Sequence, residues 1–168
     1  LQDEGYTTRE AATGEAALEQ VKTRAPAAVI LDIWLENSRF DGRQVLSAIK
    51  AMRPTVPVVM ISGHGTIATA VQAIKQGAYD FIEKPFEADR LLVVLGRAME
   101  AARLKREILD KVREYAAIAH APKPFVPFQS KVPYAGRVFD DREVVALTSS
   151  ALDFWLTLGP YGAEFEQT

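Results

Sequence analysis

Val29-Ile30-Leu31-Asp32-Ile33 is the segment around which this 168-residue chain is organised. Four of its five residues are Val, Ile or Leu, a composition typical of a strand buried on both faces in a parallel sheet. Asp32 therefore lies at the carboxyl end of a strand. Because ligands of open α/β sheets bind just outside these ends, we expect Asp32 to have a functional role rather than only to cap the next turn.

Two later apolar segments also end in polar residues. Val56–Ser62 ends in the hydroxyl of Ser62, and the segment 79–85 ends in Lys84 before a proline. Parallel strands bring their carboxyl ends to one edge of the sheet, so we expect Asp32, Ser62 and Lys84 to converge there. Such a carboxylate can accept a phosphoryl group as a nucleophile while the hydroxyl and the ammonium stabilise the phosphoryl oxygens.

These segments resemble the receiver domain of two-component response regulators, which implies an α/β, flavodoxin-like, doubly wound parallel sheet. The resemblance implies that Asp32 is the phosphoacceptor, that Ser62 and Lys84 are its partners, and that Phe81 is the switch aromatic. In the family the bond corresponding to Lys84–Pro85 is usually cis.

The loop after Asp32 indicates which type of receiver the chain resembles. It reaches Asp41-Gly42 after nine residues, two more than in most receivers. This extension, with Trp-Leu at 34–35 and Ser-Arg-Phe at 38–40, resembles NtrX-type nitrogen regulators. The resemblance implies a sensor histidine kinase as partner, and we also expect a homodimer through the region from the fourth to the fifth receiver helix.

The resemblance also implies Mg²⁺. Receivers hold this ion with the acceptor carboxylate, a backbone carbonyl and an acidic pair at the end of their first strand. Asp32 and the backbone carbonyl of Trp34 match two of these positions, whereas the acidic pair is missing because the chain starts at what looks like the end of the first helix. We expect weak or absent Mg²⁺ binding, because one carboxylate has little affinity for a hard cation.

The amino-terminal residues predict a receiver without its first strand. Leu1–Tyr6 is typical of a final helical turn closed by Gly5, Thr7–Ala12 of a short strand, and 13–24 of a helix capped by Thr13. The family places its first strand between the strands at 7–12 and 29–33. We therefore expect these two strands to pair directly, or the amino end to be disordered.

As an alternative, a strand from another chain or from the carboxyl-terminal tail could fill the position of the missing first strand. The segment Arg137–Glu143 imitates the strand-Asp-Asp-helix entry of a receiver. Only two apolar residues precede its acids and Pro133 lies close upstream, so we expect Asp140 and Asp141 to lie far from Asp32.

Helical periodicity predicts three further helices. The helix 43–52 is expected to bury Val45, Leu46, Ile49 and Met52, and the helix 66–76 carries the apolar stripe Ile67, Val71 and Ile74. A long helix from Ala88, ended by Pro122, carries a stripe in which Lys105 occupies one core position; its apolar members are Leu91, Leu95, Ala98, Ala102, Leu109, Val112 and Ala116.

The last third differs from the receiver. Residues 121–136 form a proline-punctuated, aromatic arm, and Asp140 with Glu143 predicts a capping box opening a helix to about Leu156. Lys-Pro-Phe-Val-Pro, Gly-Arg-Val-Phe-Asp, Leu-Asp-Phe-Trp-Leu-Thr and Gly-Pro-Tyr-Gly-Ala-Glu-Phe-Glu resemble the amino-terminal lead-in of vitamin-B6-dependent (PLP or PMP) sugar 3-dehydrases and sugar aminotransferases. We therefore divide the chain into a truncated receiver, 1–106, and a helical and extended appendage, 107–168, joined by natural fusion, engineering or an assembly artefact.

Composition excludes several classes of protein. Residues 107–168 hold 6 Lys or Arg against 9 Asp or Glu, which argues against nucleic-acid binding. The sequence contains no membrane-length apolar run, and the amino end has no signal-peptide pattern. The absence of cysteine excludes disulfides and thiolate sites and fits a cytoplasmic chain.

Three functions follow from these patterns. The first is a phosphoacceptor signalling module that is not an enzyme, impaired by loss of its first strand. The second is a fragment of a sugar-modifying enzyme, whose cofactor body would follow Thr168. The third is an inactive chimeric fragment.

Overall fold

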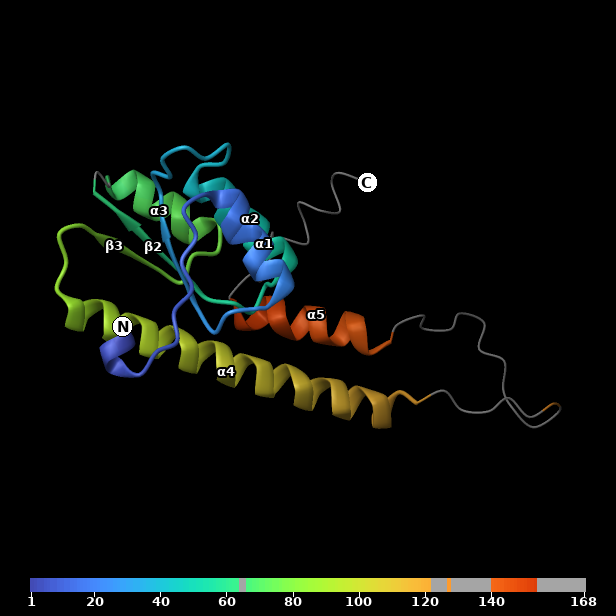
Figure 1. The fold of residues 1–168 in the computed structure, drawn as a ribbon. Helices are drawn as coiled ribbons and strands as arrows, with labels where there is room; N and C mark the ends of the chain where they lie inside the picture. The colour runs from blue at the N-terminus through green and yellow to red at the C-terminus, as the bar shows by residue number, and fades with distance from the viewer. Residues whose placement is uncertain (64–65, 122–126, 128–139, 154–168) are drawn as a thin grey trace. The chain divides into compact units, whose positions relative to one another are not determined.

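The computed structural model describes residues 1–63, 66–121, 127 and 140–153 (Figure 1). The chain divides into two compact units, Leu1–Arg103 and Leu104–Thr168, and the longest helix contributes to both. In chain order the elements are η1 (Gln2–Glu4), α1 (Gly14–Thr23), β1 (Val29–Asp32), α2 (Gly42–Met52), β2 (Val58–Ser62), α3 (Ile67–Lys75), β3 (Asp80–Glu83), α4 (Ala88–Ala119) and α5 (Asp141–Leu152).

The first unit is built on a parallel three-stranded sheet in the order β1-β2-β3. Val29 pairs with Val58 at the start of β1, and Asp32 pairs with Ile61 at its end. The side chains of the central strand β2 are buried at Val58, Val59 and Met60, which matches the prediction from its unbroken apolar run.

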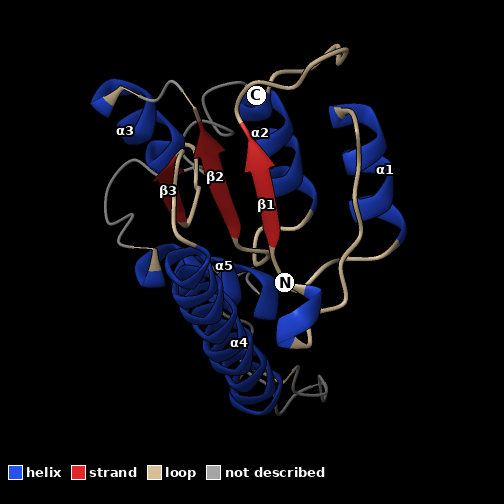
Figure 2. Ribbon diagram, turned by 60° about the vertical axis from the view of Figure 1, so that its left-hand side comes forward, coloured by secondary structure: helices blue, strands red, loops and turns tan. Residues whose placement is uncertain are grey.

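Helices cover both faces of this sheet (Figure 2). Val45, Leu46 and Ile49 of α2 pack with Leu31 and Met60 on one face, where Val21 of α1 and Ala73 of α3 join the same core cluster. On the opposite face the first half of α4 packs through Leu95 and Ala98. The layers are those of the predicted doubly wound α/β domain.

Side-chain caps define where the helices begin. Thr13 accepts a hydrogen bond from the N–H of Ala16, and Thr66 accepts one from Thr69. Asp41 and Gln44 form a full capping box at the start of α2. These caps satisfy amide groups that the first helical turn leaves without partners, and the predicted cap Thr13 is confirmed.

The predicted strand Thr7–Ala12 is wrong. None of its residues is in a strand, and β1 is an edge strand of the described sheet, so the expected direct pairing of these segments does not occur. The amino end is not disordered either. Arg9 donates to the carbonyls of Gln20 and Arg24, and Gln20 donates to the carbonyl of Glu10. This segment is therefore tied to α1 rather than to a strand.

The prediction that Met52 is buried fails. Met52, the last residue of α2, is 40% exposed. The stripe Ile67, Val71 and Ile74 of α3 is exposed, because α3 turns Ala73 toward the core instead.

The second unit contains the end of α4 and the helix α5. Lys105 Nζ lies 2.7 Å from Asp153, and Arg113 Nε lies 3.7 Å from Asp141, so the two helices run antiparallel. Leu109 and Ala116 of the apolar stripe are buried, and the side chain of Lys105 in the same stripe is only 18% exposed.

The capping box that opens α5 is confirmed. Asp140 accepts from the N–H of Arg142, and Glu143 accepts from the N–H of Asp140. Hydrogen bonds from the Arg142 side chain lower the pKa of Asp140 to about 2, so the capping carboxylate is ionised at neutral pH. Most of the predicted arm 121–136 lies outside the described residues. The helix ends at Leu152, before the predicted end near Leu156.

Within the described part of the chain, the helices are too short or too polar to cross a membrane.

We predict that Asp41→Ala lowers the free energy of unfolding by about 1 kcal/mol, because the N–H of Gln44 at the start of α2 loses its capping oxygen. Urea unfolding would measure the change. Asp41→Asn keeps a capping oxygen and should remain close to the parent. An unchanged midpoint for the alanine variant would show that the box contributes nothing.

Candidate functional site

Asp32 and Lys84 meet at the carboxyl edge of the sheet. The Nζ of Lys84 lies 2.5 Å from Oδ2 of Asp32, and the N–H of Trp34 donates to Oδ1 at 3.1 Å. The side chain of Asp32 remains 26% exposed. Each carboxylate oxygen thus has one positively polarised partner, and a reagent can reach the group from solvent.

Ser62 ends β2 beside this pair. Its side chain is fully buried, and its carbonyl accepts a hydrogen bond from the N–H of Lys84 at 2.8 Å. The N–H of Ile33 donates to Ile61 in the neighbouring strand. These ladder bonds hold the three predicted residues at the ends of adjacent strands.

Phe81 lies on β3, three residues before Lys84. It is partly buried against the core cluster that contains Val45 and Leu46. It also lines a groove of about 360 Å³ with Ala70, Val71, Ile74, Lys75 and Asp80. The Lys84–Pro85 bond is cis, as the sequence resemblance implied.

The start of α1 holds the extended loop after Asp32. Glu15 accepts from the N–H of Arg39 at 2.8 Å and from the hydroxyl of Ser38 at 3.2 Å. The N–H of Gly14 donates to the same hydroxyl. Backbone N–H groups of Glu15 itself and of Arg39 lower the pKa of Glu15 below its usual value, so this carboxylate is ionised at neutral pH.

Gly42 lies directly against the end of β1. Its N–H donates to the carbonyl of Ile33 at 2.9 Å. A Cβ at this position would lie 2.1 Å from the carbonyl oxygen of Asp32 and 2.7 Å from Cα of Ile33. Only glycine allows this close approach of the two backbones.

The donor set at this edge falls short of a Mg²⁺ site. Magnesium prefers six oxygen ligands, and receivers supply several carboxylates. Here Asp32 already pairs with Lys84, and the described residues contain no group of three or more acidic or histidine side chains that could hold a metal.

Comparison with known proteins identifies the family. Residues 1–95 match the response regulator receiver domain. The chain belongs to this family. The predicted flavodoxin-like fold and receiver resemblance are therefore confirmed.

The NtrX-type resemblance is confirmed as well. The chain is 58% identical over 110 residues to the nitrogen assimilation regulatory protein NtrX of Azorhizobium caulinodans, covering 66% of this chain and 24% of that protein. The receiver therefore spans about a quarter of the length of this curated relative.

Solved structures of receiver domains are similar to this chain as well. The receiver domain of NtrX from Brucella abortus is 58% identical, with a TM-score of 0.57 over 59% of this chain and 82% of that chain. The beryllofluoride-activated NtrC4 receiver domain dimer is 38% identical, with a TM-score of 0.56 over 60% of this chain and 82% of that chain.

Sequence reasoning missed the groups that support the receiver site. Gly14, Glu15 and Ser38 hold the loop, and Gly42 contacts the strand end. The extra length of the loop was the available signal, because a longer loop needs additional anchoring groups. Nothing in the local pattern of residues 13–15 indicated that they serve this purpose.

We predict that Gly42→Ala lowers the free energy of unfolding by about 1–3 kcal/mol, because the new methyl group overlaps the backbone of β1. Gly96→Ala is the matched control, since nothing lies within 4 Å of its added Cβ and it lies inside α4. Thermal unfolding of both variants would measure the difference. Equal stabilities would contradict the close approach at Gly42.

Proposed function

We propose that this chain accepts a phosphoryl group on Asp32 from the phosphohistidine of a sensor histidine kinase. A carboxylate oxygen of Asp32 attacks phosphorus, the phosphorus–nitrogen bond breaks, and the histidine nitrogen takes up a proton. The observation that carries the proposal is an accessible carboxylate at a strand end, held between an ammonium and a backbone N–H.

Lys84 and Ser62 are proposed to recognise the transferred group. The ammonium of Lys84 already neutralises the carboxylate at 2.5 Å. It can move to a phosphoryl oxygen once the carboxylate has become an acyl phosphate. Ser62 ends the adjacent strand, from which its hydroxyl could donate to a second phosphoryl oxygen. Phe81 would then change its packing as the switch aromatic, using the groove beside α3.

Dimerisation is proposed through α3 and the region that follows it. Ile67, Val71 and Ile74 leave an apolar stripe of α3 exposed. A related receiver, from NtrC4, is a dimer in its beryllofluoride-activated form. Burial of the stripe against a second copy would remove apolar surface from water.

The sugar-enzyme resemblance of residues 107–168 stays a prediction from the sequence, as do the domain boundary at 106 and the cytoplasmic location. The predicted separation of Asp140 from Asp32 also remains untested, because these residues belong to different units.

We predict that Asp32→Asn reduces phosphoryl uptake from acetyl phosphate to background, because the amide lacks a nucleophilic oxygen. Intact-mass spectrometry in excess Mg²⁺ would measure the modified fraction. Glu83→Gln is the matched control, since this carboxylate is exposed at the end of β3 and should be dispensable. Uptake by Asp32→Asn at the parent level would refute the assignment.

We predict that Mg²⁺ binds the parent chain with a dissociation constant above about 1 mM, because a single carboxylate in an ion pair is a poor site for this ion. Isothermal titration of the chain with MgCl₂ would test this. Sub-millimolar binding that disappears in Asp32→Asn would contradict the expectation.

A further inference from the structure

The second half of α4 carries two apolar stripes, and the receiver function uses neither. The inner one contains Leu109 and Ala116 and lies on the side of the ion pairs to α5. The other, here called the outer stripe, repeats at alternating intervals of four and three residues, the spacing of a helix-packing seam. It consists of Leu104, Ile108, Lys111, Tyr115 and Ile118.

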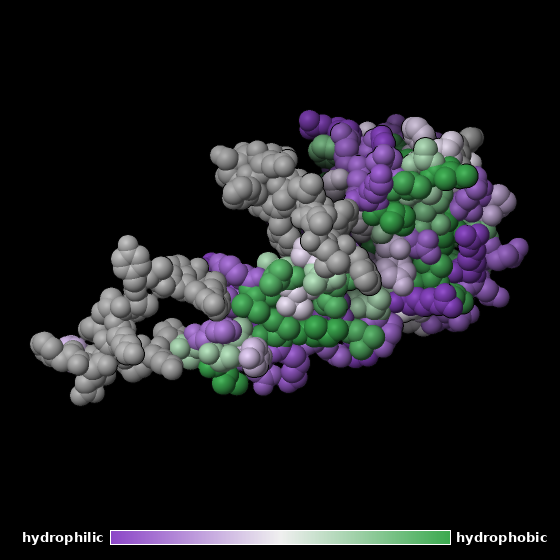
Figure 3. Space-filling model, turned by 180° about the vertical axis from the view of Figure 1, so that it is seen from behind, coloured by the Kyte–Doolittle hydropathy of each residue, from purple (hydrophilic) through white to green (hydrophobic). Residues whose placement is uncertain are grey.

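The outer stripe is exposed along its whole length. The exposed fractions are 45% for Leu104, 42% for Ile108, 66% for Tyr115 and 76% for Ile118. Figure 3 shows apolar side chains gathered in a band in this helical part of the chain. Four large apolar side chains in register on one helix face are more than scattered surface residues, so the stripe calls for a partner.

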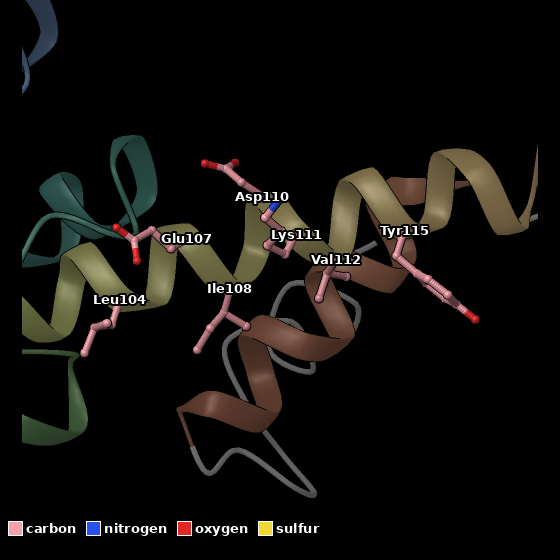
Figure 4. A pocket seen from close by; sticks show the side chains of 7 residues that line it. All are labelled: Leu104, Glu107, Ile108, Asp110, Lys111, Val112 and Tyr115. Carbon is pink, nitrogen blue, oxygen red and sulfur yellow. The ribbon is translucent and has the colours of Figure 1, made fainter.

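The stripe also lines an open groove of about 650 Å³ on the surface of α4. Leu104, Ile108 and Val112 point to one side of the helix, whereas Asp110 points to the other (Figure 4). A volume of this size accommodates several large side chains.

The charged side chains around this groove do not favour a strongly acidic or strongly basic partner. Asp110 is paired with Arg113 and Lys111 with Glu114, each at 2.7 Å. These opposite charges neutralise one another along the helix, so an apolar segment fits the groove best.

The end of α5 indicates which segment is nearest. Asp153 pairs with Lys105 at 2.7 Å, which places the residue after α5 at the level of α4 where the outer stripe begins with Leu104. The next 15 residues, 154–168, lie outside the described residues and are rich in large apolar side chains: Phe154, Trp155, Leu156, Leu158, Tyr161 and Phe165.

Length permits this segment to follow the whole stripe. The distance from Leu104 to Ile118 along the helix is about 21 Å at 1.5 Å per residue. Fifteen residues can extend over about 50 Å. The segment 154–168, here called the aromatic tail, therefore reaches every position of the stripe from its starting point.

We propose that the aromatic tail docks on the outer stripe of the same molecule. A second copy is the competing occupant. Four half-exposed side chains give about 400 Å² per partner, so a dimer would bury about 800 Å², less than stable interfaces require. The tail needs no second molecule, because its attachment to α5 gives it an effective concentration in the millimolar range.

Trp155 fluorescence tests the docking. Trp34→Phe leaves Trp155 as the single tryptophan of the chain. We expect blue-shifted emission and slower acrylamide quenching than in a free peptide of sequence 154–168. Leu104→Ser combined with Ile108→Ser should lower the docking equilibrium constant by at least about tenfold and move both signals toward the peptide values.

Val93→Ser is the matched control, because Val93 is 52% exposed on the same helix but lies in the first unit. It should leave Trp155 unchanged. Circular dichroism should show equal helix content in all variants. Emission equal to that of the free peptide in the parent, or a Trp155 signal insensitive to the stripe substitutions, would overturn the proposal.

Cysteine cross-linking distinguishes the two occupants, because the chain has no cysteine of its own. The pair Ile108→Cys and Leu158→Cys should oxidise to an intrachain disulfide, visible as faster migration on a non-reducing gel. Ile108→Cys alone should stay monomeric at micromolar concentration. A covalent dimer formed by the single variant would show that a second copy occupies the stripe and would overturn the proposal.

Discussion

Parallel pairing of β1 with β2, and of β2 with β3, brings Asp32, Ser62 and Lys84 to one edge of the sheet. Each strand by itself offers only one polar end. Because all three strands run in the same direction, their carboxyl ends lie together, and residues 22 to 52 positions apart become neighbours. The hydrogen bond from the N–H of Lys84 to the carbonyl of Ser62 is one of the inter-strand bonds that hold these ends together.

The charges at this edge suit a reaction that adds negative charge. Asp32 is held by Lys84 and by the N–H of Trp34, so its carboxylate is already oriented, as the proposed phosphoryl transfer requires. The surrounding loop is fixed through Glu15 and Ser38, and Gly42 allows α2 to approach the strand end. Residues that never touch the reacting atoms therefore determine where the carboxylate lies.

Helix α4 joins the receiver to the second unit while changing its surroundings along its length. Its first half packs on the sheet through Leu95 and Ala98. In its second half the side of Lys105 carries the ion pairs to α5, and the outer stripe lies exposed. The apolar stripe of α4 thus contributes to two cores, because different segments along one helix can pack against different partners.

Local patterns in the sequence were sufficient for β1, β2 and β3 and for the helix caps at Thr13 and Asp140, since buried strands and capping residues depend on near neighbours. Asp140 with Glu143 is an example. Long-range partners decided the rest. Thr7–Ala12 has the composition of a strand, yet a strand exists only where another strand supplies hydrogen bonds. Contacts between distant segments likewise decided the exposure of the α3 stripe and the anchoring of the loop by Glu15, and no periodicity in the sequence encodes such contacts.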